Sequence, residues 1–89
     1  MDNVYDLYRR GSELLAHGDY QAAIVPLSRA RDLEPDKTSI REALGRAMQL
    51  LGRHREACHP LALACSLRPA RRDYRIYRDR ARRDRDRAA

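Results

Sequence analysis

The pattern of apolar and polar residues along the chain favours helices over strands. No stretch of about four to eight residues alternates β-branched or aromatic side chains with polar ones, as a half-buried strand would. The apolar residues are mainly Leu and Ala, which are strong helix formers. Glycine and proline divide the chain into segments of helical length. The predicted helices run from Asn3 to His17, Tyr20 to Leu33, Ile40 to Leu51 and Arg53 to Leu67.

All glycines and prolines recur at one interval. When the sequence is shifted by 34 residues against itself, the four Gly and the four Pro fall into matched pairs. The pairs are Gly11 with Gly45, Gly18 with Gly52, Pro26 with Pro60 and Pro35 with Pro69. Four apolar pairs share the interval: Ala23 with Ala57, Leu27 with Leu61, Ala30 with Ala64 and Leu33 with Leu67. A shared interval for every helix breaker predicts an internal repeat.

Each predicted unit is a pair of helices. In the first unit, Gly18 ends a helix in the left-handed conformation that glycine adopts at low cost, and Asp19 is expected to cap the next helix. Pro35 stops the second helix, and residues 36–39 supply capping side chains for the third.

The glycines and prolines that fall inside the predicted helices also make structural predictions possible. Gly11 and Gly45 each cost about 0.8 to 1 kcal/mol relative to Ala, which indicates close helix packing against Ala23 and Ala57. Pro26 and its equivalent Pro60 are expected to bend their helices.

The pattern resembles the tetratricopeptide repeat (TPR), a pair of helices of about 34 residues. The family's slots for Trp, Leu-Gly, Tyr, Ala, Phe and Pro hold Leu7, Arg10-Gly11, Leu14, Ala23, Leu27 and Pro35 in the first unit. The second unit has Arg41, Leu44-Gly45, Met48, Ala57, Leu61 and Pro69. Arg10 and Arg41 depart from the apolar residues of the family, and the aromatic slots hold smaller or charged side chains. The resemblance spans Val4 to Pro69 and implies an all-α fold, a right-handed α-solenoid of two units, residues 4–35 and 38–69.

Residues 70–89 are predicted to form a fifth, capping helix. Ala70, Tyr74, Tyr77 and Ala81 recur on one stripe of a helix, which is expected to fray after about Arg83. The expected i,i+4 ion pairs are Arg75 with Asp79, Arg80 with Asp84 and Arg82 with Asp86. Stacked repeats need a polar end cap, and a second copy of the chain, forming a homodimer, is the alternative to this helix.

Charge and composition restrict the class of protein. The formal net charge of +6 resides in the segment after Leu67, because acidic and basic residues balance before it. The chain opens on acidic residues and has no apolar run long enough to span a bilayer, so a cytoplasmic protein without a membrane segment is expected. Only one of the 19 basic residues is Lys, a bias that we interpret as the mark of a GC-rich bacterial genome.

No catalytic or cofactor-binding constellation is visible, so the chain is not expected to be an enzyme. His54, Cys58, His59 and Cys65 form the one tempting metal-ligand cluster. His54 and Cys58 are one helical turn apart, but Cys65 lies two turns further along, roughly 10 Å away. The preferred interpretation is that Cys58 and Cys65 are small buried apolar residues on one helix face.

Binding of a protein or peptide partner is therefore the predicted function. The resemblance implies a concave groove lined by the first helix of each unit. Its residues would be Tyr5, Tyr8, Ser12 and Leu15, then Ser39, Glu42, Arg46 and Gln49, with Arg9 and Arg46 available to an acidic ligand. Packing of Tyr5 and Tyr8 in the N-terminal core is the alternative to a role as binding anchors.

The alternative function is binding of nucleic acid or another acidic surface by the C-terminal segment. The residues expected to contact an anionic partner are Arg71, Arg72, Arg75 and Arg78, with Tyr74 and Tyr77 stacking on bases. Four Asp in the same segment weaken its positive field, and such charge patterns are more often a solvated helix face.

Overall fold

The computed structural model describes residues 3–88, with only the backbone described for Ala88. It contains five helices: α1 (Val4–Ala16), α2 (Tyr20–Leu33), α3 (Thr38–Leu50), α4 (His54–Leu67) and α5 (Arg72–Ala88). No strand occurs within residues 3–88, which confirms the all-α prediction over that range. The predicted bounds of the first four helices hold to within two residues. Residues 1, 2 and 89 of the predicted units lie outside the described residues.

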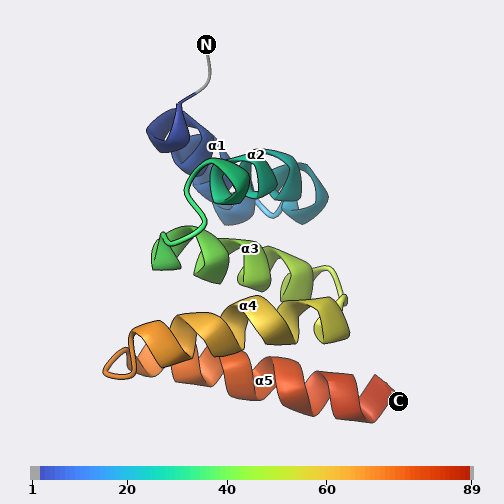
Figure 1. Cartoon of the computed structure of the whole chain (residues 1–89). Helices are drawn as coiled ribbons and strands as arrows, with labels where there is room; N and C mark the ends of the chain where they lie inside the picture. Colours follow the sequence, from blue (N-terminus) through green and yellow to red (C-terminus); the bar gives the residue numbers. More distant parts are fainter. Residues whose placement is uncertain (1–2, 89) are drawn as a thin grey trace.

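The helices pack in the order in which they follow one another along the chain. Each contacts its sequence neighbour extensively, and α3 also touches α1 on one side and α5 on the other. Figure 1 shows the result, with α1 and α2 at one end, α3 and α4 in the middle and α5 lying along α4 at the other end. One side of α4 is thus covered by α5 of the same chain.

The turns between paired helices share one backbone geometry. Gly18 and Gly52 have φ angles of 84° and 86°, the left-handed region predicted for Gly18. The amide of Gly18 donates to the carbonyl of Leu15, and the amide of Gly52 donates to that of Gln49, one repeat interval later. These equivalent turns reverse the chain so that α2 packs on α1 and α4 packs on α3.

The interior glycines allow close packing, but the residue that meets them differs from the prediction. A Cβ on Gly11 would lie 2.5 Å from Cγ of Leu27, and one on Gly45 would lie 2.7 Å from Cγ of Leu61. Leu27 and Leu61 are fully buried. The atoms nearest to these glycines thus belong to the larger Leu27 and Leu61, and not to the predicted Ala23 and Ala57, which are also buried.

The predicted capping residues are wrong for two helices. Asp19 precedes α2 and Lys37 precedes α3, but neither side chain accepts a capping hydrogen bond. Side-chain capping occurs instead at α1, where Oδ1 of Asn3 accepts from the amide of Asp6 at 2.8 Å. Pro26 and Pro60 lie within α2 and α4, and neither proline ends its helix.

Helix α5 begins later and extends further than predicted. Ala70 lies in the exposed turn before it, so the expected four-residue stripe is reduced to Tyr74, Tyr77 and Ala81. Tyr74 and Ala81 are buried against α4, and Tyr77 packs beside them. The helix continues past Arg83, where fraying was expected, to Ala88.

The three i,i+4 ion pairs predicted for α5 are wrong. Arg78 instead pairs with Asp79 at 3.0 Å and Arg85 with Asp86 at 3.1 Å, both between sequence neighbours. Asp84 turns toward α3 and α4 instead of pairing with Arg80. No helix within residues 3–88 is both long enough and apolar enough to cross a bilayer.

Candidate functional site

The N-terminal part of the candidate groove lies where α1 meets the start of α3. A pocket of about 220 Å³ there is lined by residues that include Tyr5, Tyr8 and Ser39. Tyr5 is 73% exposed, whereas Tyr8 packs against the buried residues around Leu7 and Leu27. The two tyrosines therefore differ. Tyr5 is accessible to a partner, as a binding anchor must be, and Tyr8 belongs partly to the core.

The other predicted groove residues of α1 differ in their accessibility. Arg9 is exposed and lies 3.8 Å from the carboxylate of Asp6. Ser12 is half-buried. Leu15 is buried in the core with Ala23 and Leu27, so the prediction that it lines the groove is wrong. Its apolar side chain is shielded by packing between α1, α2 and α3.

Glu42 and Arg46 form an ion pair on α3 that faces α5. The Glu42 carboxylate is buried and contacts Nε of Arg46, one turn further along the helix. The Arg46 guanidinium lies over the ring of Tyr77 on α5, 5.2 Å from its centroid. Burial raises the pKa of Glu42, and the nearby Arg46 charge opposes that rise. Through Arg46, the pair thus links α3 to α5.

Gln49 is buried and hydrogen-bonded, which the prediction of a free groove residue did not anticipate. Its Nε2 donates to Oδ2 of Asp84 at 2.5 Å, and its Oε1 lies 2.8 Å from Nδ1 of His54. Nδ1 of His54 is also 4.0 Å from the Asp84 carboxylate. The three side chains join α3, α4 and α5, so Gln49 has a structural role. Gln49 and Asp84 are 35 residues apart in the sequence, so no short motif predicts their hydrogen bond.

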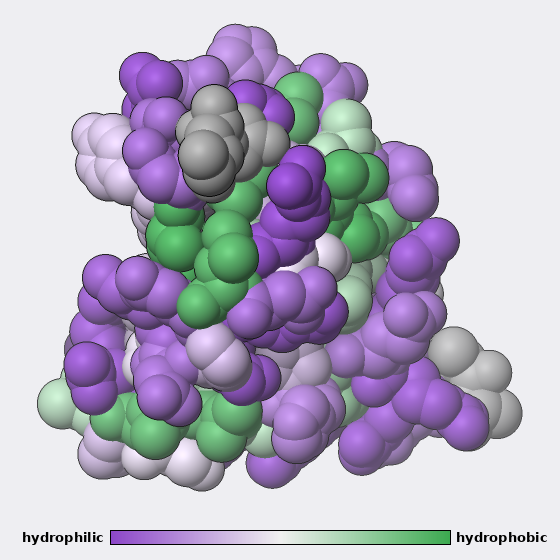
Figure 2. All heavy atoms as spheres, turned by 45° about the horizontal axis from the view of Figure 1, so that its top comes forward, coloured by the Kyte–Doolittle hydropathy of each residue, from purple (hydrophilic) through white to green (hydrophobic). Residues whose placement is uncertain are grey.

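A second pocket, the α3–α5 pocket, opens beside these contacts. It has a volume of about 320 Å³ and is lined by Arg46, Gln49, Leu50, Tyr77, Arg80 and Asp84. Sequence reasoning found Arg46 and Gln49 but missed the other four residues. The 34-residue interval was a usable signal, because it relates Ser12 to Arg46 and Arg46 to Arg80. On the face of the molecule shown in Figure 2, apolar side chains form separate patches among hydrophilic ones.

The predicted anionic-partner residues of the C-terminal segment are not equivalent. Arg71 pairs with Asp73 at 2.8 Å and lies over the ring of Tyr74, and the Arg71 hydrogen bond lowers the pKa of Asp73. Arg78 is paired with its neighbour Asp79. Tyr74 is 4% exposed, so the expectation that it stacks on a base is wrong. The burial of Tyr74 also raises the pKa of its phenol.

Arg72 and Arg75, the other two predicted residues, are exposed and make no ion pair with a residue in the described range. They remain the accessible part of the anionic-partner hypothesis.

The cysteines lie in different environments on α4. Cys65 is buried beside Ala64 and Tyr74, as the apolar interpretation predicted. Cys58 is half-buried and donates from Sγ to the carbonyl of His54 at 3.2 Å. Within the part of the chain that the structure describes, no three His, Cys, Asp or Glu side chains gather around a point that a metal ion would occupy.

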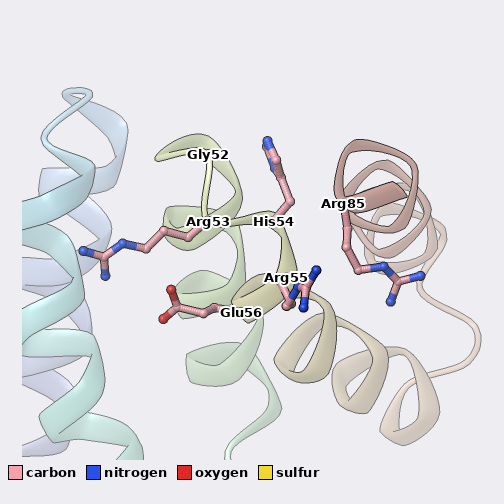
Figure 3. Close-up of a pocket in the computed structure, with 6 residues that line it drawn as sticks. All are labelled: Gly52, Arg53, His54, Arg55, Glu56 and Arg85. Carbon is pink, nitrogen blue, oxygen red and sulfur yellow. The ribbon is translucent and has the colours of Figure 1, made fainter. Parts of the chain in front are cut away.

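A basic pocket lies at the turn between α3 and α4 (Figure 3). Its volume is about 180 Å³, and its lining residues are Gly52, Arg53, His54, Arg55, Glu56 and Arg85. Arg53 points away from Arg55 and Arg85 in the close-up, so the three guanidinium groups do not converge on one point. The carboxylate of Glu56 also lines the pocket, and its negative charge reduces the attraction of the pocket for an anion.

Comparison of the chain with protein-family models, with curated proteins and with solved structures finds no match.

Proposed function

We propose that this chain is a TPR-like interaction module, a right-handed α-solenoid that binds a peptide segment of a partner protein. The bound segment lies along the face shared by α1, α3 and α5. The single observation that carries the proposal is the recurrence of one interval in both sequence and backbone. Helices α1, α3 and α5 begin at Val4, Thr38 and Arg72, which are 34 residues apart.

The backbone around each turn supports the repeat. The residues before α2 and α4, Asp19 and Arg53, have φ and ψ of −86° and 64° and of −84° and 62°. The residues after the same helices, Glu34 and Arg68, have φ of −136° and −135°. Such agreement at four positions favours two copies of one helical hairpin.

Helix α5 fits the role of an end cap in this repeat. By the same interval it corresponds to α1 and α3, yet Asp79 stands where those helices have Gly11 and Gly45. Arg82 stands where they have Leu14 and Met48. Both Asp79 and Arg82 are exposed. A charged outer face of this kind is typical of the terminal unit of a repeat array.

The position of the pockets supports binding between the first helices of the units. One pocket lies between α1 and the start of α3, and the α3–α5 pocket lies between the next pair. Exposed Tyr5 borders the first and half-exposed Leu50 borders the second. Aromatic and apolar side chains in such positions are common anchors for a bound segment.

The proposal is tested by selecting peptides from a random displayed library on the full chain. We expect selected peptides to lose affinity for Tyr5→Ala by at least about fivefold, because truncation of an aromatic anchor costs more than about 1 kcal/mol. Val25→Ala on α2 is the matched control, since Val25 is 63% exposed and lies away from these pockets. The dissociation constants are measured by fluorescence anisotropy.

Two results would contradict the proposal. One is a set of selected peptides whose affinity is unchanged by Tyr5→Ala and by substitutions in the α3–α5 pocket. The other is an equal loss of affinity in Val25→Ala, which would place the binding surface elsewhere or show that the peptides recognise an unfolded state. Circular dichroism of each variant distinguishes these two explanations.

Nucleic-acid binding by α5 has less support. Only Arg72 and Arg75 among its predicted contacts are both exposed and free of a carboxylate partner within residues 3–88. The buried ring of Tyr74 removes one of the two aromatic contacts that the hypothesis included.

A further inference from the structure

The α3–α5 pocket combines an apolar wall with a cation, Arg80, that makes no ion pair with the described residues. The wall consists of Leu50, which is half-exposed, and Tyr77. The volume of about 320 Å³ lies near the lower end of the range of about 300 to 1,000 Å³ for ligand pockets. A pocket of this size and openness to the groove suits one or two side chains of a longer ligand.

The charged side chains around the pocket differ in whether they already have a partner within the protein. Arg46 is paired with Glu42, and Asp84 accepts a hydrogen bond from Gln49. Arg80 is exposed and makes no ion pair with any residue between 3 and 88. Arg83, which is also exposed and unpaired in that range, follows less than one turn later. The Gln49 amide is neutral and does not cancel the Asp84 charge, so Arg80, Arg83 and Asp84 together leave one excess positive charge at this end of the groove.

The same geometry makes the pocket a poor site for nucleobases. The guanidinium of Arg46 lies over the ring of Tyr77, so that face of the ring is already covered. A carboxylate-bearing peptide can place its charge on Arg80 and an apolar side chain on the wall at the same time.

We propose that the α3–α5 pocket binds an acidic peptide segment, holding one of its apolar side chains against Leu50 and Tyr77 while Arg80 pairs with a neighbouring carboxylate. The inference rests on the proposed function, because it assigns a ligand chemistry to the same groove. An Arg–carboxylate pair at its exposed edge gives orientation and charge selectivity to the apolar contact.

The probes are fluorescein-labelled peptides with a central leucine flanked on each side by glutamates, by lysines or by serines. We expect the glutamate peptide to bind the full chain and the lysine peptide to bind at least about tenfold more weakly. Arg80→Glu should weaken the glutamate peptide by about tenfold, and Leu50→Ser should weaken it independently of salt.

Arg82→Glu is the matched control. It makes the same change of charge on the same helix, at an exposed residue that does not line the pocket. We expect it to alter affinity for the glutamate peptide by less than about twofold at 0.15 M salt, because residues two apart project from different sides of a helix and salt screens the remaining indirect effect of the charge. A single-stranded oligonucleotide with the same label tests the other class of anionic partner.

The proposal is overturned if the glutamate peptide does not bind below about 1 mM, or if the lysine peptide binds equally well. Equal effects of Arg80→Glu and Arg82→Glu, or an oligonucleotide that competes with the peptide in the pocket, would also overturn it. The proposed function is tested separately. Library-selected peptides that depend on Tyr5 but carry no acidic residues would support peptide binding in the groove and contradict only its acidic specificity.

Discussion

Gly11 and Gly45 occupy positions where a methyl group has no room. The nearest atoms to a Cβ at each position belong to Leu27 and Leu61, whose side chains are fully buried and cannot swing into solvent. Glycine is unfavourable inside a helix, so its presence at both positions is explained by the approach of the leucine from the paired helix.

We predict that Gly45→Ala destabilises the protein by about 1 to 2 kcal/mol, because overpacking costs about 1 to 3 kcal/mol and the gain in helix propensity returns up to about 1 kcal/mol. Urea denaturation followed by circular dichroism measures the change. In a Leu61→Ala background the same substitution should cost less, since the clashing side chain is gone. Additive effects of the two substitutions would contradict the steric explanation.

Glu42 is a second residue whose environment has a measurable consequence. Burial raises the pKa of its carboxyl above the ordinary value of 4.5. A carboxyl with a raised pKa binds its proton more tightly in the folded state. Its contribution to stability is therefore present below the unfolded pKa and is lost as pH rises through the folded pKa.

We predict that wild type loses stability relative to Glu42→Gln as pH rises from about 4 to about 7. Asp73→Asn is the opposite control, because the Arg71 hydrogen bond lowers the pKa of Asp73 below 3.8. Relative to that variant, wild type should gain stability as pH rises through the acid range. Thermal unfolding at several pH values measures both trends, and slopes of the same sign would refute the assignment for Glu42.

At the scale of the elements, α5 is held by burial of Tyr74 and Ala81, by the Arg46 guanidinium over the Tyr77 ring and by a hydrogen-bonded contact with α3. That contact is the hydrogen bond from buried Gln49 to Asp84, supported by His54. Removing Asp84 leaves the Gln49 amide without this acceptor inside the protein, and an unsatisfied buried donor costs about 1 to 3 kcal/mol.

We predict that Asp84→Ala destabilises the fold by about 1 to 2 kcal/mol. Asp86→Ala is the matched control, because the Asp86 side chain is 70% exposed and, among the described residues, pairs only with its neighbour Arg85. Its effect should stay within about 0.5 kcal/mol. Denaturant titration compares the two variants. An equal effect would mean that the contact with Gln49 does not hold α5 in place.

The sequence was informative about the elements and less so about their contacts. Gly18, Pro35 and Gly52 mark helix ends by local backbone chemistry, so the bounds of the helices followed closely. The ion pairs of α5 could not be predicted in the same way. Asp84 bonds to Gln49 on α3 instead of pairing with Arg80, and the spacing of residues along α5 does not reveal a partner on another helix.

The residues of the candidate site could be predicted only in part, because contacts between helices are not visible in local sequence spacing. Tyr5, Ser39 and Arg46 line pockets between the first helices. Leu15 and Gln49 are absorbed by core packing and by hydrogen bonding to α5, which depend on the tertiary structure. Arg46 supports buried Glu42, so replacing it tests stability as well as binding, and exposed Tyr5 and Arg80 are cleaner probes of the groove.

At the scale of the whole molecule, the charged outer side of α5 limits how the chain can assemble. A further helix packed there, from this chain or another copy, would have to desolvate Asp79 and Arg82 at a cost of several kcal/mol per ion. Head-to-tail growth into a filament is thereby opposed at this end. If the units stack as proposed, the charged side of α5 would therefore limit how many of them can be added at this end.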